Sequence, residues 1–119
     1  MNKYYEYKKC STCRKGKKYI EDKGINLEVI DMVEEPPSEY ELKDIVSKAD
    51  NYEIDDFFNK RGKVFKVLGL KEKLDTMSFD EKIKLLSSDG MLIKRPMLVT
   101  ESAVILGFKE EEYDAVLNN

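Results

Sequence analysis

The chain has 119 residues, of which 24 are acidic and 21 basic, giving a net charge of −3. A protein that grips phosphate backbone with its whole surface needs a net basic footprint, so we expect no direct nucleic-acid partner. No apolar run approaches the roughly 18 residues of a membrane span, and the N-terminal residues lack the apolar core of a signal peptide. We therefore expect a cytoplasmic monomer of one domain, residues 1–119, without membrane association.

The sequence contains no histidine, and this excludes several kinds of catalytic site. Cysteine–histidine pairs, Ser-His-Asp triads and HExxH zinc sites all require an imidazole. Two cysteines are also too few for a four-thiolate zinc site within one chain. We expect no metal ion and no bound cofactor.

The first third of the chain predicts a strand, a helix and a second strand. Residues Lys3–Tyr7 alternate weakly and carry three tyrosines, as a short strand does. Helix-forming residues run from Ser11 to Lys23, and Gly24 follows where a left-handed residue would end the helix. Leu27–Met32 is the next strand. Such a βαβ unit pairs its strands in parallel through a right-handed crossover.

Residues 38–88 predict a helical insert that begins after the chain break at Pro36–Pro37. Ser38 and Ser78 each stand three residues before a glutamate, which is the spacing of a capping box at a helix start. Between these two helices, apolar residues recur at helical spacing over Ile54–Leu68, with interruptions at Gly62 and Gly69.

Strand material returns after the insert, in Leu92–Ile93, Met97–Val99 and Ala103–Leu106, and a last short helix carries Tyr113. The complete order is β-α-β, helical insert, β-β-α. This order predicts an α/β fold with a mixed sheet of about four strands flanked by helices.

Cys10 and Cys13 lie where the first strand gives way to the first helix. A cysteine there faces the free N–H groups and the positive end of the helix dipole, which favour thiolate over thiol. Four cations add to this effect: Lys8, Lys9, Arg14 and Lys15. We predict that Cys10 is the nucleophile and that Cys13, one helical turn later, resolves the mixed disulfide. Ser11 and Thr12 could donate hydrogen bonds to the thiolate and add little bulk.

Two other interpretations of the cysteine pair stay open. The cysteines could simply be small buried residues at a strand–helix junction, since free cysteine is often buried. They could also contribute to a metal site shared between two chains.

Arg95–Pro96 directly precedes a predicted strand. In a thioredoxin-like fold, a cis-proline loop stands opposite the CxxC turn, and proline is the residue for which a cis bond costs little. We therefore predict a cis Arg95–Pro96 bond, with a trans proline at the strand start as the alternative.

The chain has only three arginines among its basic residues, and arginine suits bidentate recognition of anions. We predict that Arg95 faces Cys10, and we assign anion or substrate binding to this residue together with Ser11, Thr12, Arg14 and Pro96. The third arginine, Arg61, lies in a basic run with Lys63. That run is either a solvated helix face or a contact with a partner.

With these motifs placed, the whole chain resembles the arsenate reductase-like family (ArsC/Spx/YffB), a thioredoxin-like branch. The resemblance is carried by Cys10–Lys15, Pro36–Ser38, Gly69–Leu70, Ile93–Pro96 and Gly107–Lys109.

The resemblance implies a thiol–disulfide redox protein in which Cys10 and Cys13 form a reversible disulfide. The reductant would be thioredoxin or glutathione with glutaredoxin, acting as a co-substrate. An alternative is an Spx-like regulator whose disulfide controls binding to the RNA polymerase α subunit, with Arg61 and Lys63 in the docking segment. A third is a glutaredoxin-coupled arsenate reductase, in which Cys10 and Arg95 match the nucleophile and one clamp arginine. Asn59 and Ile105 stand where the other two arginines would be.

Overall fold

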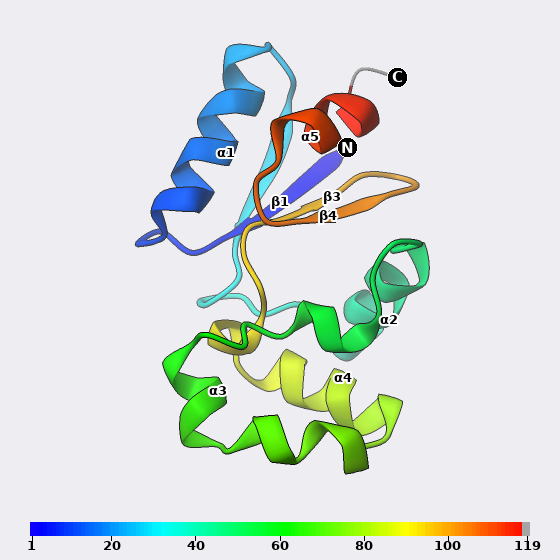
Figure 1. Ribbon diagram of the computed structural model, residues 1–119. Helices are drawn as coiled ribbons and strands as arrows, with labels where there is room; N and C mark the ends of the chain where they lie inside the picture. Colours follow the sequence, from blue (N-terminus) through cyan, green and yellow to red (C-terminus); the bar gives the residue numbers. More distant parts are fainter. Residues whose placement is uncertain (118–119) are drawn as a thin grey trace.

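The computed structural model describes residues 1–117, and a four-stranded mixed sheet lies at its centre (Figure 1). Its strands are β1 (Asn2–Glu6), β2 (Leu27–Asp31), β3 (Met97–Val99) and β4 (Val104–Leu106), in the spatial order β2-β1-β3-β4. β1 pairs in parallel with β2, whereas β1 with β3 and β3 with β4 are antiparallel. The predicted mixed α/β sheet and its parallel βαβ unit are confirmed.

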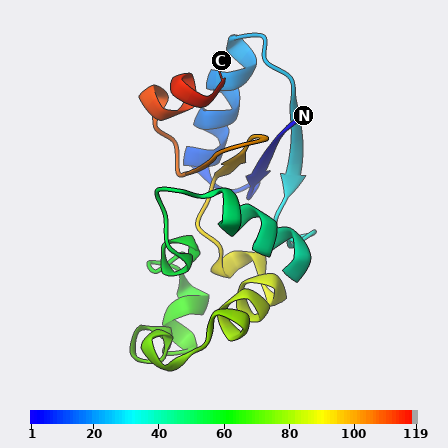
Figure 2. The same ribbon diagram turned by 90° about the vertical axis from the view of Figure 1, so that its right-hand side faces the viewer.

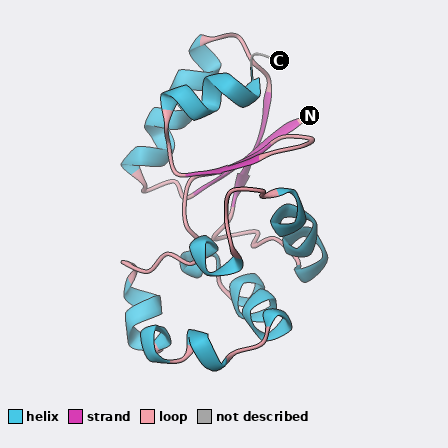
Figure 3. Cartoon of the chain, turned by 45° about the vertical axis from the view of Figure 1, so that its right-hand side comes forward, coloured by secondary structure: helices cyan, strands magenta, loops and turns pink. Residues whose placement is uncertain are grey.

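Helices cover both faces of this sheet. α1 (Ser11–Asp22) and α5 (Glu110–Leu117) lie over one face, and the insert lies against the other (Figure 2 and Figure 3). The insert contains α2 (Glu39–Lys48), α3 (Lys63–Val67) and α4 (Phe79–Ser88), joined by short 3-10 turns. Among residues 1–117, no helix has both the length and the apolar character needed to cross a bilayer.

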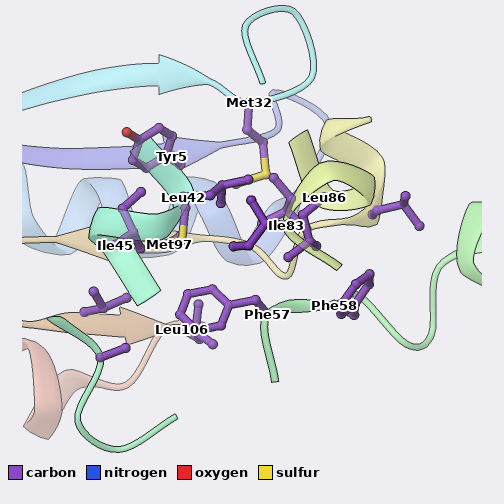
Figure 4. Packing of buried hydrophobic residues seen from close by; sticks show 14 of the residues in the cluster. Tyr5, Met32, Leu42, Ile45, Phe57, Phe58, Ile83, Leu86, Met97 and Leu106 are labelled. Carbon is purple, nitrogen blue, oxygen red and sulfur yellow. The ribbon is translucent and has the colours of Figure 1, made fainter. Parts of the chain in front are cut away.

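Two apolar clusters result from the alternation of side chains along the strands. Tyr4 points toward α1 and α5, where it packs with Ile20, Leu98, Ile105 and Tyr113. Tyr5, the next residue, belongs to the larger cluster on the opposite face, between the sheet and the insert. Figure 4 shows this second cluster, in which Tyr5, Met97 and Leu106 from the sheet lie beside residues of the insert.

The predicted helix boundaries are confirmed where local chemistry sets them. The Ser38 and Ser78 hydroxyls each accept the backbone N–H of the glutamate three residues later, at 3.1 Å in both cases. Each glutamate in turn accepts the backbone N–H of its serine, which completes both capping boxes. Gly24 follows α1 with φ +74°, the left-handed conformation expected there.

One strand predicted after the insert was wrong. Leu92–Ile93 is not a strand of the sheet, because residues 90–92 form a 3-10 turn capped by the Asp89 side chain, which accepts the Met91 N–H at 2.8 Å. Ile93 instead forms an isolated bridge with Phe58.

The helical stretch over Ile54–Leu68 is interrupted at Gly62, as predicted, but the break begins before that glycine. A 3-10 turn ends at Phe57, and α3 begins only at Lys63. The intervening backbone bonds to the chain after α4, since Asn59 N–H donates to Leu92 O at 2.7 Å and Lys94 N–H donates to Phe57 O at 2.8 Å. These partners, distant in sequence, override the local helical pattern.

Candidate functional site

The sulfur of Cys10 caps the N-terminus of α1. Cys10 lies at the end of the loop after β1 with extended backbone angles, and its Sγ accepts the backbone N–H of Cys13 at 3.2 Å. Its own N–H donates to Tyr7 O at 3.0 Å, and its carbonyl accepts from Arg14 N–H at 3.2 Å. Serine, threonine or asparagine usually occupies such a position, so here a sulfur takes the place of the capping oxygen. The helix start therefore presents an N–H group and its positive dipole end to Cys10.

Cys13 is the buried member of the pair. Its side chain is wholly inaccessible, whereas Cys10 is partly exposed, and both thiols are free. Burial, followed by the hydrogen bond with Cys10, raises the pKa of the Cys13 thiol to about 12. The two sulfurs thus differ in access: a reactant from solvent can reach Cys10 but not Cys13.

The polar residues of the CxxC turn are exposed. Ser11 and Thr12 lie on the first turn of α1, and the hydrogen-bond donor found at Cys10 Sγ is the Cys13 backbone rather than either hydroxyl. Arg14 donates from Nη1 to Lys8 O at 2.9 Å, which ties the first turn of α1 to the preceding loop. Arg14 therefore holds the loop in place while remaining open to solvent on its other side.

The Arg95–Pro96 bond is cis, as predicted. Pro96 is buried, and its carbonyl accepts the Gly107 N–H at 2.8 Å. Because Tyr5 pairs with Met97 across antiparallel strands, the residues beyond this pair bring Arg95 opposite Tyr7. The Arg95 guanidinium lies 5.1 Å above the Tyr7 ring, a cation–π distance. The proline loop therefore lies beside the turn that carries Cys10.

Arg95 also lines an open pocket of about 710 Å³ between the sheet and the insert. Arg61, Lys60, Lys94 and Lys109 share this pocket, and Asp56 is the one acidic residue of its lining. Nη1 of Arg95 is buried, and within residues 1–117 it has no hydrogen-bond partner. Concentrated positive charge around an unpaired guanidinium nitrogen suits an anionic group.

Of the other residues singled out in the sequence, some line this pocket and others do not. Asn59 lines it, whereas Ile105 is buried in the smaller apolar cluster under α5. Arg61 and Lys63 are exposed around the start of α3, and of these two Arg61 reaches the pocket. The structure thus brings Arg61 and Arg95 together, which the sequence analysis treated as separate features.

Sequence analysis missed a polar group beneath the cysteines. Glu6 at the end of β1 is only 5% exposed and forms an ion pair with Lys17 of α1. The Tyr4 hydroxyl, on the same face of β1, donates to Cys13 O at 2.8 Å. The available signal was the alternation of β1, which places residues 4 and 6 on one face. This alternation places the charged Glu6 in the same layer as the buried Tyr4, which is unusual for a glutamate.

Taken together, the fold and the site define a CxxC protein of thioredoxin-like fold, with its first cysteine at a helix start and a cis-proline loop alongside. More narrowly, the chain belongs to the ArsC family, whose model matches residues 5–116. The family resemblance and the fold predicted from the sequence are confirmed.

Individual relatives cover nearly the whole chain. The uncharacterized protein YusI of Bacillus subtilis is 46% identical over 111 residues, which are 93% of each chain. The regulatory protein MgsR of the same organism is 30% identical over 109 residues, covering 92% of this chain and 84% of MgsR. The crystal structure of an ArsC family related protein from Bacteroides fragilis is 38% identical, with a TM-score of 0.91 over 96% of this chain and 95% of that one.

Proposed function

We propose that this protein is a dithiol–disulfide redox protein in which Cys10 is the nucleophile and Cys13 the resolving cysteine. The observation that carries the proposal is the unequal pair of thiols. Cys10 is accessible and its sulfur accepts a helix N–H, whereas Cys13 is buried one turn further along the same helix. An accessible attacking thiol with a buried partner one helical turn away is the arrangement that two-step disulfide exchange requires.

In the first step, the Cys10 thiolate attacks one sulfur of a substrate disulfide. A bond forms between Cys10 and that sulfur, the substrate S–S bond breaks, and the second substrate sulfur leaves as a thiolate. The helix N-terminus stabilises the attacking charge before the reaction. This step removes the negative charge from Cys10.

In the second step, Cys13 loses its proton and attacks Cys10 Sγ. The bond between Cys10 and the substrate breaks, the substrate leaves as a second thiolate, and a Cys10–Cys13 disulfide remains. The protein has lost two electrons and the substrate disulfide has gained them. A thiol reductant, either thioredoxin or glutathione with glutaredoxin, returns the protein to its dithiol form.

The basic pocket indicates the side from which a substrate approaches Cys10. Arg95 lies between the pocket and the Cys10 turn, since its guanidinium stacks on Tyr7 and also lines the pocket. We assign the pocket to the anionic part of the substrate or of the reducing thiol, with Pro96 supplying the backbone beside it. Ser11, Thr12 and Arg14 would face the incoming sulfur from the first turn of α1.

Equilibration in glutathione redox buffers tests the proposal. The wild-type protein should form a reversible intramolecular disulfide, detected as a loss of two alkylatable thiols by mass spectrometry. Cys13→Ser should instead accumulate a mixed disulfide with one glutathione, and Cys10→Ser should accumulate none. If no disulfide forms at any glutathione ratio, or if Cys10→Ser reacts as readily as Cys13→Ser, the assignment of the two cysteines is wrong.

The second candidate function is redox-controlled binding to the RNA polymerase α subunit. The observations that favour it are the match to the regulatory protein MgsR and the exposure of Arg61 and Lys63 around the start of α3. Gly62, between them, caps α3, and a Cβ at this position would come 2.6 Å from Asn59 Nδ2. Two exposed cations at the start of a helix suit an acidic partner surface.

Binding to the isolated C-terminal domain of the α subunit separates the two functions. A stable complex that depends on the redox state of Cys10 and Cys13 and is lost in Arg61→Glu would favour the regulator. Lys71→Glu, outside the pocket that Arg61 lines, is the matched control. Disulfide turnover without such binding would favour the redox enzyme.

Arsenate reduction is the third candidate and has the least support. Arg95 is available as one clamp arginine, but Asn59 is neutral and Ile105 is buried. Arsenate-dependent oxidation of a coupled thiol system, measured beside the disulfide assay, distinguishes this activity.

A further inference from the structure

A buried carboxylate, Glu6, forms an ion pair with the partly exposed Lys17 on the cysteine side of the sheet and has no part in the steps described above. Lys17 Nζ is 3.3 Å from Oε1 and 3.4 Å from Oε2 of Glu6, and only the contact to Oε2 has hydrogen-bond geometry. Oε1 is buried, and in the described part of the chain it has no hydrogen-bond partner. A buried carboxylate oxygen with an unused acceptor site is costly unless it serves another purpose.

This carboxylate shares a layer with the Cys13 thiol. Tyr4 and Glu6 point to the same face of β1, and Tyr4 reaches the Cys13 carbonyl, so that face lies against the first turns of α1. Lys17 follows Cys13 by four residues, which places both on one side of the helix. A backbone hydrogen bond from Tyr7, the residue after Glu6, acts on the Cys13 thiol and lowers its pKa, opposing the effect of burial. Cys13 therefore lies beside the Glu6–Tyr7 peptide.

The resolving step needs a proton acceptor in this layer. Because burial raises the pKa of the Cys13 thiol, this thiol is protonated at neutral pH and must lose its proton before it attacks. The titratable groups that face Cys13 are Cys10 at the helix start, Tyr4 and Glu6 on β1, and Tyr113 on α5.

Three of these four groups cannot accept the proton. Burial raises the pKa of both Tyr4 and Tyr113, so both stay protonated. Cys10 is bonded to the substrate in the mixed disulfide and carries no charge. The Glu6 carboxylate, whose Oε1 is paired with Lys17 but accepts no hydrogen bond within residues 1–117, is the group that remains.

We propose that Glu6 accepts the proton of Cys13 in the resolving step, directly or through one water molecule, and that Lys17 holds the carboxylate in position. The inference rests on the proposed disulfide chemistry. The S–H bond of Cys13 breaks and its proton passes to Glu6, while the sulfur electron pair forms the bond to Cys10 Sγ and the substrate leaves as a thiolate. Glu6 then returns the proton to solvent past the Lys17 side chain, which is 31% exposed.

Stoichiometric reaction with dithiobis(nitrobenzoate) measures the two steps separately. Attack by Cys10 releases one thionitrobenzoate, and resolution by Cys13 releases the second, so a stopped-flow trace has two phases. Wild type, Glu6→Gln and Lys17→Met are compared over a range of pH. Glu28→Gln, which alters an exposed glutamate on the neighbouring strand β2, is the matched control.

We expect the first phase of Glu6→Gln to stay within about two-fold of wild type, while the second slows at least about ten-fold at neutral pH. The second phase of Glu6→Gln should depend more steeply on hydroxide concentration than that of wild type. In Lys17→Met, loss of the ammonium disfavours the ionised carboxylate, so the acid limb of the profile should move to higher pH.

The possible outcomes distinguish a failure of the Glu6 role from a failure of the proposed disulfide function. If wild type releases only one thionitrobenzoate per chain, the proposed disulfide function fails. If wild type releases two and Glu6→Gln matches its second phase at every pH, only the role of Glu6 is overturned. Should Glu6→Gln lose its native circular dichroism spectrum, Lys17→Met decides: an unshifted pH profile overturns the inference.

Discussion

Gly16 lets α1 pack directly against Tyr4 of β1, and an alanine there should destabilise the protein. A Cβ on Gly16 would overlap the hydroxyl oxygen of Tyr4. Tyr4 is fully buried and donates to Cys13 O, so it cannot move aside without losing that hydrogen bond. The next atoms a Cβ would meet, in Phe108 and Tyr113, are 3.4 Å away, an ordinary contact distance.

The magnitude follows from two opposing effects. In an exposed helix, replacing glycine by alanine stabilises by about 1 kcal/mol. Forcing a methyl group into an occupied site costs about 1–3 kcal/mol. We expect Gly16→Ala to lower the free energy of unfolding by up to about 2 kcal/mol. In a Tyr4→Phe background the overlapping oxygen is gone, and the same alanine should become neutral or stabilising.

Urea unfolding followed by far-ultraviolet circular dichroism, on wild type, both single variants and the double variant, measures the coupling. Tyr4→Phe alone should cost about 1 kcal/mol for the lost hydrogen bond. The coupling energy between the two sites should be about 2 kcal/mol in favour of the double variant. Additive effects, or a Gly16→Ala protein more stable than wild type, would refute the close approach of α1 and β1 at this position.

Three further predictions concern Asp114, the two cysteines and Arg95. Asp114 has a lowered pKa, chiefly because the Tyr19 hydroxyl donates to it at 2.7 Å. Its stabilising contribution is present above the unfolded pKa of 3.8 and is lost as pH falls through the lower folded value, so Asp114→Asn should make acid unfolding less steep. Iodoacetamide at neutral pH should alkylate Cys10 alone in the native protein and both cysteines in urea, as peptide mass spectrometry would show, because Cys13 is buried with a raised pKa. Arg95→Met should slow reaction with the dianionic glutathione disulfide about ten-fold, but leave the rate with neutral hydroxyethyl disulfide nearly unchanged.

A contrary result can be named for each of these three predictions. An unchanged acid unfolding profile for Asp114→Asn would mean that the hydrogen bond from Tyr19 does not persist in solution. Alkylation of Cys13 in the native protein would contradict its burial. Equal slowing of both disulfides by Arg95→Met would show that the guanidinium acts on the cysteine turn rather than on substrate charge.

Features set by short-range chemistry could be predicted from the sequence. The capping boxes at Ser38 and Ser78, the left-handed Gly24 and the strand–CxxC–helix unit each depend on residues within a few positions of one another. The cis bond before Pro96 was also predicted, because the motif order fixed where the loop must lie. Local rules were sufficient for these elements.

Features that depend on partners distant in sequence were not predicted. The bridge between Phe58 and Ile93 joins residues that no periodicity connects, so Ile93 was placed in a sheet strand instead. The ion pair of Glu6 and Lys17 requires the angle at which α1 crosses β1, which spacing alone does not give. The union of Arg61 and Arg95 in one pocket likewise depends on how the insert folds back.

Because alternate side chains of β1 enter two different apolar layers, this strand cannot gain or lose a single residue without harm. Tyr4 and Tyr5 are neighbours, yet one fills the layer under α1 and the other the layer above the insert. Deleting or adding a single residue early in β1 would exchange the two layers for every residue between that point and Glu6, sending the acid into the wrong core. Length variation is therefore excluded from this strand, whereas the exposed turn at Lys71–Lys73 can absorb extra residues without disturbing either layer.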